Sequence, residues 1–120
     1  MAKKILVVDD DPVGSTIMKA RLSGAGFEVL TAIDGMHGLE AVREHHPDLI
    51  ILDIEMPTMN GYVFILEMKQ DSSISSIPVM VLTSHEENKP IFRRKGILHY
   101  LVKPVNFDDL FAHMKELIGE

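Results

Sequence analysis

The sequence predicts a single α/β domain in which a parallel sheet of five strands is covered by helices on both faces. Short apolar runs alternate along the chain with longer stretches of helical spacing. These apolar runs are continuous and rich in β-branched residues, as is typical of strands buried on both faces. The length of 120 residues favours one domain, 1–120, whose core needs no disulfide.

Five apolar runs are the expected strands, at residues 5–8, 28–32, 49–52, 79–82 and 99–102. The first helix begins at Asp11-Pro12, an N-cap carboxylate followed by proline, and ends at Ala25-Gly26. Its expected core-facing stripe has helical spacing and consists of Val13, Ile17, Ala20 and Gly24.

The second helix follows Asp34-Gly35, and Met36, Leu39 and Val42 recur at helical spacing along it. A third helix spans residues 61–70 and is apolar on almost every side. We expect its sheet-facing stripe to be Tyr62, Ile65 and Met68. Phe64 and Leu66 then either form a partly exposed patch for a partner or add to the core, and core packing is the slightly favoured alternative.

The fourth helical stretch, residues 86–95, contains Pro90 and is expected to be short or irregular. Asn106 is the expected cap of a last helix whose apolar residues repeat at helical spacing: Leu110, Phe111, Met114, Leu117 and Ile118. Right-handed crossovers between five such units favour a doubly wound, flavodoxin-like (βα)5 fold with strand order 2-1-3-4-5.

Composition excludes several classes of function. The 12 basic and 18 acidic residues give a net charge of −6, which offers nucleic acid no basic surface. The absence of cysteine excludes disulfides and thiolate chemistry. No apolar run suits a signal peptide or a membrane span, so we expect a cytoplasmic protein without membrane insertion. The six histidines lack ligand spacing and are interpreted as surface residues.

Polar residues follow four of the expected strands. They are Asp9-Asp10-Asp11, Asp53, Thr83-Ser84 and Lys103. Each feature alone could be an ordinary helix cap or a turn, but the carboxyl ends of parallel strands meet at one edge of the sheet. Clustered carboxylates repel one another, and a hard divalent cation such as Mg²⁺ relieves that repulsion. A phosphoryl group on Asp53 would use Mg²⁺ and Lys103 to balance charge and Thr83 as a hydrogen-bond donor.

These residues also carry a family resemblance. Over its whole length the chain closely resembles the receiver domain of bacterial two-component response regulators. The matching motifs are Ile5-Leu6-Val7-Val8-Asp9-Asp10, Asp53-Ile54-Glu55-Met56-Pro57 with Asn60-Gly61, Val81-Leu82-Thr83-Ser84 and Tyr100-Leu101-Val102-Lys103-Pro104.

The resemblance implies a role for each matching residue. Asp53 would accept the phosphoryl group. Asp10, Asp53 and the backbone carbonyl of Glu55 would bind Mg²⁺, and Asp9 would help through a water molecule. Lys103 would pair with the phosphoryl group, beside a cis peptide bond to Pro104.

The resemblance also implies a switch and its regulation. Thr83 and Tyr100 would move on phosphorylation and alter the face formed by the fourth helix, fifth strand and fifth helix. Glu55 and His85 occupy positions that would tune the lifetime of the phosphoryl group. The chain would then catalyse only its own phosphorylation and dephosphorylation, and would not otherwise be an enzyme.

The implied partners are a histidine kinase or histidine phosphotransfer protein and a downstream protein target. The first helix and the loop after the fifth strand are the expected kinase-docking surface. The chain would be a monomer or a weak, phosphorylation-dependent dimer, and the unusual fourth helix places a dimer through that face in doubt. A single-domain regulator and one domain of a longer protein are equally compatible with the sequence.

Three alternatives stay open at this stage. A haloacid-dehalogenase-like phosphohydrolase would use Asp9 as its nucleophile, with Asp11 in the same motif, but the chain lacks a cap and the late acidic motif. A phosphorylation-independent interaction module would need neither Mg²⁺ nor Asp53. A flavin carrier is disfavoured because no phosphate-binding loop follows the first strand.

Overall fold

The computed structural model describes residues 2–55, 61–85, 89–94 and 99–119. Five parallel strands form one sheet in the order β2-β1-β3-β4-β5. The strands are β1 (Lys4–Val8), β2 (Glu28–Ala32), β3 (Leu49–Asp53), β4 (Val79–Thr83) and β5 (Tyr100–Val102). The predicted doubly wound topology and strand order are therefore confirmed.

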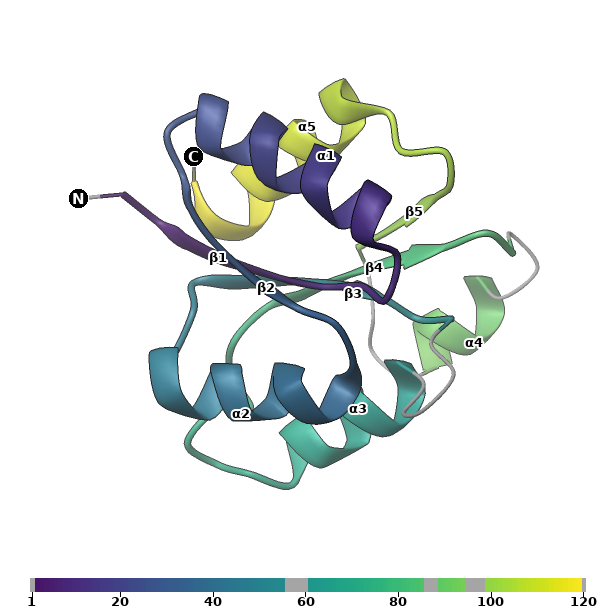
Figure 1. Cartoon of the computed structure of the whole chain (residues 1–120). Coiled ribbons are helices and arrows are strands. Elements are labelled where there is room, and N and C mark those ends of the chain that lie inside the picture. The colour runs from purple at the N-terminus through teal and green to yellow at the C-terminus, as the bar shows by residue number, and fades with distance from the viewer. Residues whose placement is uncertain (1, 56–60, 86–88, 95–98, 120) are drawn as a thin grey trace.

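Helices cover both faces of this sheet (Figure 1). They are α1 (Pro12–Gly24), α2 (Gly35–His45), α3 (Gly61–Lys69), α4 (Lys89–Arg94) and α5 (Phe107–Ile118). In Figure 1, α1 and α5 lie on one face, and α2 and α3 lie on the other. None of the helices in the described parts of the chain is both long and apolar enough to cross a bilayer.

The two faces hold two separate core clusters, and strand β1 contributes to both. Ile5 and Val7 pack in the cluster with residues of α1 and α5, whereas Leu6 and Val8 pack in the cluster with residues of α2 and α3. Successive strand residues point to opposite faces, so a sheet covered on both sides needs an unbroken apolar run.

Side-chain caps fix the starts of three helices as predicted. The Asp11 carboxylate accepts the Val13 N–H at 3.0 Å, with Pro12 at the first helical position of α1. Asp34 accepts the His37 N–H at 2.8 Å at the start of α2. Asn106 accepts the Asp109 N–H at 3.1 Å and begins α5. Each contact satisfies a donor that the first turn leaves without a partner.

The predicted buried face of α1 is wrong. Val13 and Ile17 are 67% and 51% exposed, and Ala20 and Gly24 also face solvent. The buried residues of this helix are Met18 and Leu22. Both stripes have helical spacing, so periodicity within the helix does not distinguish them. The longer side chains of Met18 and Leu22 fill the space over the sheet.

The predictions for α2 and α3 are partly wrong. Met36 is 64% exposed, although Leu39 and Val42 are buried as expected. On α3, Ile65 and Met68 are buried as predicted. Phe64 is fully buried, in line with the favoured core packing, whereas Leu66 is 55% exposed. Tyr62 is only partly buried.

Helix α2 explains the burial of Phe64. A Cβ atom on Gly38 of α2 would lie 3.0 Å from Cε2 of Phe64, so the ring packs directly over this glycine. The space for the Phe64 ring therefore comes from a different helix, and the spacing within α3 does not reveal it.

Two further expectations concern α4 and the histidines. The described part of the fourth helical stretch is the six-residue helix α4, and residues 86–88 and 95 lie outside the described ranges. His99 and His113 are partly buried, and their Nδ1 atoms lie 2.9 Å apart. The interpretation of all six histidines as surface residues is wrong for this pair, because the fold places α5 beside the start of β5.

Candidate functional site

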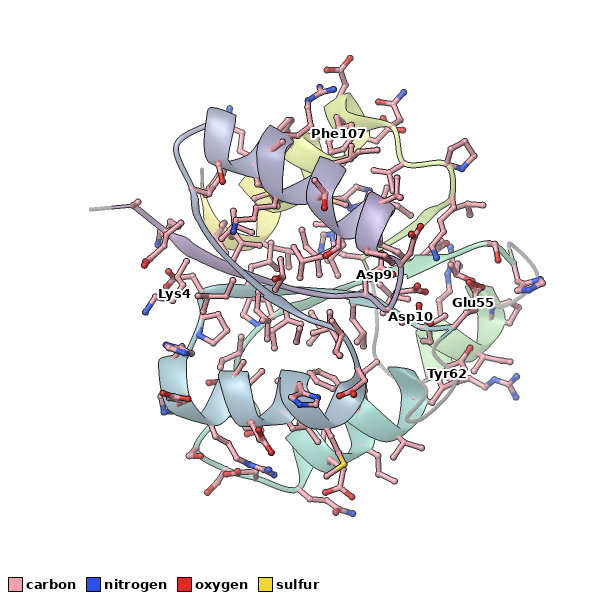
Figure 2. All side chains as sticks on the ribbon, in the orientation of Figure 1. Lys4, Asp9, Asp10, Glu55, Tyr62 and Phe107 are labelled. Atoms are coloured by element: carbon pink, nitrogen blue, oxygen red, sulfur yellow. The ribbon has the colours of Figure 1, made fainter. Side chains whose placement is uncertain are left out.

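The polar residues that follow the strands meet at one edge of the sheet. Asp9 follows β1, Asp53 ends β3, Thr83 ends β4 and Lys103 follows β5. Figure 2 shows Asp9, Asp10 and Glu55 at the same end of the molecule, away from Lys4 at the start of β1. Among the described residues, the only buried polar or charged side chains are those of Asp9, Asp53 and Thr83. Burial of polar groups is costly, so their gathering at one edge marks a functional site.

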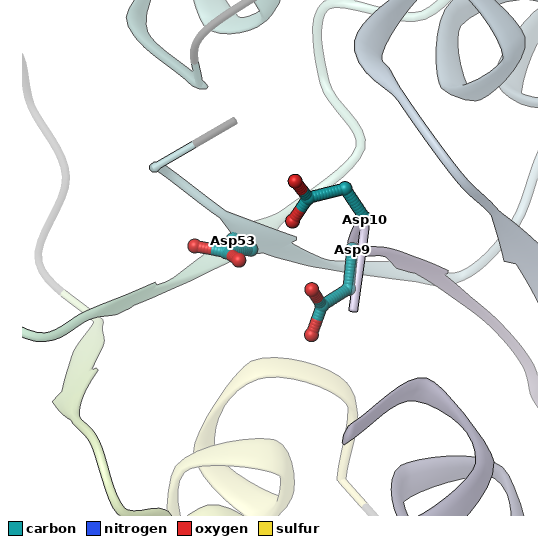
Figure 3. Close-up of side chains that lie close together, drawn as sticks. All are labelled: Asp9, Asp10 and Asp53. Carbon is teal, nitrogen blue, oxygen red and sulfur yellow. The ribbon is translucent and has the colours of Figure 1, made fainter. Parts of the chain in front are cut away.

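Three carboxylates form the centre of this site (Figure 3). One oxygen atom from each of Asp9, Asp10 and Asp53 lies within 4.8 Å of the other two. Asp9 and Asp53 are 8% and 2% exposed, whereas Asp10 is exposed. Like charges this close raise one another's energy, and a hard cation that takes oxygen ligands is the usual compensation.

The protonation of Asp9 reflects this crowding. Burial raises the pKa of the Asp9 carboxyl to about 6; the hydrogen bond from the Asp11 N–H opposes the shift, and the negative charge of Asp53 adds to it. The N–H of Asp11 lies 2.9 Å from Oδ1 of Asp9. The charged form of the Asp9 carboxyl therefore costs free energy of folding, because burial and the charge of Asp53 both disfavour it.

Lys103 supplies positive charge beside the phosphoacceptor candidate Asp53. Its Nζ lies 3.0 Å from Oδ2 of Asp53 and 3.8 Å from Oε2 of Glu55. Burial lowers the pKa of Lys103, but the hydrogen bond and charge of Asp53 and the charges of two further carboxylates leave it above its ordinary value. The Lys103–Pro104 peptide bond is cis, as the resemblance implies. The backbone N–H of Lys103 also donates to the Thr83 carbonyl at 2.7 Å.

Glu55 links the ends of β3 and β4. Its backbone N–H donates to Oδ1 of Asp53 at 3.0 Å, and its carboxylate accepts the Thr83 hydroxyl at 2.8 Å. The carboxylate also accepts the Ser84 N–H at 2.8 Å. Partial burial pushes the pKa of Glu55 upward, but hydrogen bonds from Ser84 and Thr83 outweigh it and the pKa is lowered. The sequence predicts that Ser84 lies at this edge, but it does not predict the hydrogen bonds that Ser84 donates to Glu55.

His85 follows the end of β4 by two residues, and Tyr100 begins β5. Nε2 of His85 is 3.9 Å from Oε1 of Glu55, so His85 stands beside the carboxylate. Tyr100 pairs in register with Val81 and packs partly buried against the core cluster on the α2 and α3 side.

A cavity of about 340 Å³ opens beside the site, between α1 and the chain that follows β5. Its lining includes the site residues Asp9 and Lys103 together with apolar side chains, among them Ile17 and Phe107. The guanidinium of Arg21 lies 4.2 Å from the centre of the Phe107 ring and connects α1 to α5. Ile17, which is half exposed, lines the same cavity as Asp9 and Lys103.

The donor set suits a hard divalent cation. Asp9, Asp10 and Asp53 offer carboxylate oxygens and the described part of the site offers no sulfur ligand, which fits Mg²⁺ rather than a soft metal. The site also combines a buried carboxylate, a lysine and a hydroxyl donor. That combination can form an acyl phosphate and compensate its charge.

Comparisons with known proteins agree with this arrangement. Residues 5–115 match the family model described as the response regulator receiver domain. Protein PilH of Pseudomonas aeruginosa is 36% identical over 118 residues, covering 97% of this chain and 98% of PilH.

Solved structures show the same similarity. The chemotaxis protein CheY4 of Vibrio cholerae aligns with a TM-score of 0.89 and 31% identity, covering 98% of this chain and all of CheY4. The receiver domain of a sensor histidine kinase from Pseudomonas aeruginosa aligns over 100% of both chains, with a TM-score of 0.89 and 25% identity. That domain has a magnesium ion coordinated in its active-site cleft. The chain belongs to the response regulator receiver domain family.

Proposed function

We propose that Asp53 is the phosphoacceptor through which this phosphorylation-activated signalling switch works. The observation that carries the proposal is the position of Asp53, which is 2% exposed, 3.0 Å from the Lys103 ammonium group and within a cluster of three carboxylates. A buried carboxylate beside a cation can act as a nucleophile whose product charge is compensated. Membership of the receiver domain family supports the function of a phosphorylation-activated switch. The geometry supports Asp53 as the residue that accepts the phosphoryl group.

The proposed reaction transfers a phosphoryl group from a phosphohistidine. A bond forms between a carboxylate oxygen of Asp53 and phosphorus as the bond between phosphorus and the donor's imidazole nitrogen breaks. Lys103 balances the negative charge on the phosphoryl oxygens, and the Glu55 N–H orients the Asp53 carboxylate. In this proposal the chain catalyses only its own phosphorylation and its later hydrolysis.

We assign the metal site to the same cluster. Asp10, Asp53 and the backbone carbonyl of Glu55 are the proposed direct ligands of Mg²⁺, and Asp9 is proposed to act through a water molecule. Bound there, Mg²⁺ would neutralise charge on the carboxylates and on the transferred group. The support is the mutual approach of the three carboxylates within 4.8 Å.

The proposed donor is a histidine kinase or a histidine phosphotransfer protein that docks over the cavity between α1 and the chain after β5. The half-exposed Ile17 and the neighbouring Asp9 and Lys103 all line this cavity, so a partner there reaches the site directly. Ile17→Glu should slow transfer from a phosphohistidine protein at least about tenfold, because it places a charge in an apolar contact. Phosphorylation by acetyl phosphate should stay unchanged, and equal slowing with both donors would contradict this docking site.

The signal is proposed to leave the site through Thr83 and Tyr100 toward a downstream protein target. Thr83 is fully buried at the end of β4 and directly follows Leu82, which pairs with Asp53 in the register of β3 and β4. Glu55 and His85 lie side by side, with Nε2 of His85 3.9 Å from Oε1 of Glu55, and we propose that both tune the lifetime of the phosphoryl group. The similarities reported above give no support to the phosphohydrolase alternative.

Intact-mass measurement tests the phosphoacceptor. The native chain and Asp53→Asn are incubated with acetyl phosphate, with and without Mg²⁺. A gain of one phosphoryl group that needs Mg²⁺ and is lost in Asp53→Asn is the expected result. A gain that survives Asp53→Asn would point to Asp9 as the nucleophile. No gain in folded protein that binds Mg²⁺ would favour a phosphorylation-independent module.

A further inference from the structure

One carboxylate collects the hydrogen-bond donors at the end of β4. Oε1 of Glu55 accepts the Thr83 hydroxyl at 2.8 Å and the Ser84 N–H at 2.8 Å. The Ser84 hydroxyl lies 3.0 Å from both carboxylate oxygens. Three donors from two adjacent residues thus converge on a single anion, and hydrogen bonds to an ionised acceptor are the stronger kind.

The same carboxylate also shares the lysine of the site. Nζ of Lys103 is 3.0 Å from Oδ2 of Asp53 and 3.8 Å from Oε2 of Glu55. The Glu55 backbone is fixed against Asp53 through its N–H, at 3.0 Å from Oδ1. Glu55 therefore connects the end of β3, through its backbone, to the end of β4, through its side chain.

We propose that Glu55 is an internal competitor for the phosphoryl group, because it occupies, in the unphosphorylated chain, the donors that a phosphoryl group on Asp53 needs. This inference rests on the proposed function of Asp53. A phosphoryl group brings several anionic oxygens to the place where Thr83, Ser84 and Lys103 converge. It gains these donors only when the Glu55 carboxylate withdraws, since two anions cannot share them without repulsion.

The consequence is a threshold for activation. Binding of an anion at Asp53 is weakened by the free energy needed to displace Glu55, as any two-state switch is biased by the contacts of its resting state. Thr83 and Ser84 are also held in one arrangement before phosphorylation. The competition concerns occupancy of the donors and is separate from the rate at which water removes the phosphoryl group.

NMR of the unphosphorylated protein, without Mg²⁺ or phosphodonor, tests the contact itself. In Glu55→Ala the Ser84 amide should shift upfield and exchange with solvent faster, because its charged acceptor is gone. Glu55→Gln keeps an acceptor oxygen without the charge and should give an intermediate shift. Glu116→Ala, which removes an exposed carboxylate on α5, is the matched control and should leave Ser84 unchanged. A Ser84 amide that keeps its shift and exchange rate in Glu55→Ala would overturn the proposal.

Affinity for a phosphoryl analogue tests the competition. Beryllofluoride with Mg²⁺ should bind Glu55→Ala at least about tenfold more tightly than the native chain, with Glu55→Gln between them and Glu116→Ala equal to the native chain. Equal or weaker binding to Glu55→Ala would overturn the proposal, because a competitor's removal must strengthen binding.

The two tests also separate this inference from the proposed function. If the native chain gains a phosphoryl group at Asp53 but Glu55→Ala leaves Ser84 and analogue affinity unchanged, the competitor is wrong and the phosphoacceptor stands. If Ser84 responds to Glu55→Ala but no variant accepts a phosphoryl group or binds the analogue, the contact is real and its role as competitor is overturned along with the proposed function.

Discussion

At the scale of single residues, Gly61 shows how closely the chain approaches itself next to the site. Its N–H donates to the Ile54 carbonyl at 3.0 Å, and an added Cβ would lie 2.7 Å from both Cα and Cγ1 of Ile54. Because Cα belongs to the backbone, an alanine forces a shift of β3 or α3. Gly61→Ala should lower the free energy of unfolding by about 1–3 kcal/mol.

Urea denaturation measures this effect. Gly24→Ala is the control, because a Cβ there meets nothing within 4 Å and lies at the end of α1. That control should be neutral or stabilise by up to about 1 kcal/mol. Equal stabilities for Gly61→Ala and the native chain would show that the contact with Ile54 relaxes freely.

His37 and Asp34 form an exposed pair that gives a pH-dependent prediction. The hydrogen bond and charge of Asp34 raise the pKa of His37, and hydrogen bonds from the His37 N–H and ring lower the pKa of Asp34. The His37 contribution to stability is present below its unfolded pKa and is lost as pH rises through the raised folded value. The Asp34 contribution is present above its unfolded pKa and is lost as pH falls through the lowered folded value.

NMR titration of the histidine rings should show this coupling. Asp34→Asn keeps an oxygen to cap α2 but removes the charge, so the His37 pKa should fall toward its ordinary value. A His37 pKa that Asp34→Asn does not change would show that the pair is absent in solution.

At the scale of elements, α3 shows how two neighbouring helices decide which side chains are buried. Phe64 is fully buried over Gly38 of α2, whereas Leu66 is 55% exposed. Phe64→Ala should lower the free energy of unfolding by about 3–5 kcal/mol because it leaves a cavity. Leu66→Ala should change it by less than about 0.5 kcal/mol. Chemical denaturation of both variants checks this, and similar losses at the two positions would contradict the observed face of α3.

Helix α3 also illustrates which features of the fold the sequence predicts and which it does not. Apolar runs and caps such as Asp11 located the elements, because those signals are local. The faces of α1 and α3 could not be chosen locally, since Met18 and Phe64 are buried by partners on other elements. The sequence does predict that Asp9, Asp53 and Lys103 lie close together, because the carboxyl ends of parallel strands meet at one edge of the sheet. The hydrogen bonds that Ser84 donates to Glu55 depend on the direction of the Glu55 side chain, which no sequence spacing predicts.

At the scale of the whole molecule, the carboxylate cluster should lower the stability of the fold when no cation is bound. Asp9 is 8% exposed, and burial raises the pKa of its carboxyl to about 6, so its charge destabilises the metal-free fold at neutral pH. Asp9→Asn removes this charge and keeps an oxygen that accepts the Asp11 N–H. Without divalent cations it should stabilise the fold by about 1–2 kcal/mol.

With Mg²⁺ present, the native chain should become more stable than Asp9→Asn. A cation that binds only the folded chain stabilises it by about 2.7 kcal/mol at a hundredfold excess over its dissociation constant. The native chain should gain this stability, and Asp9→Asn should gain less because it offers Mg²⁺ one carboxylate fewer. Urea denaturation in EDTA and in Mg²⁺ measures both effects. Glu116→Gln, at an exposed position of α5, should stay within about 0.5 kcal/mol of the native chain in each buffer. An Asp9→Asn protein that is less stable in EDTA, or that gains as much from Mg²⁺, would mean that the carboxylate cluster is neither costly nor the site of the metal.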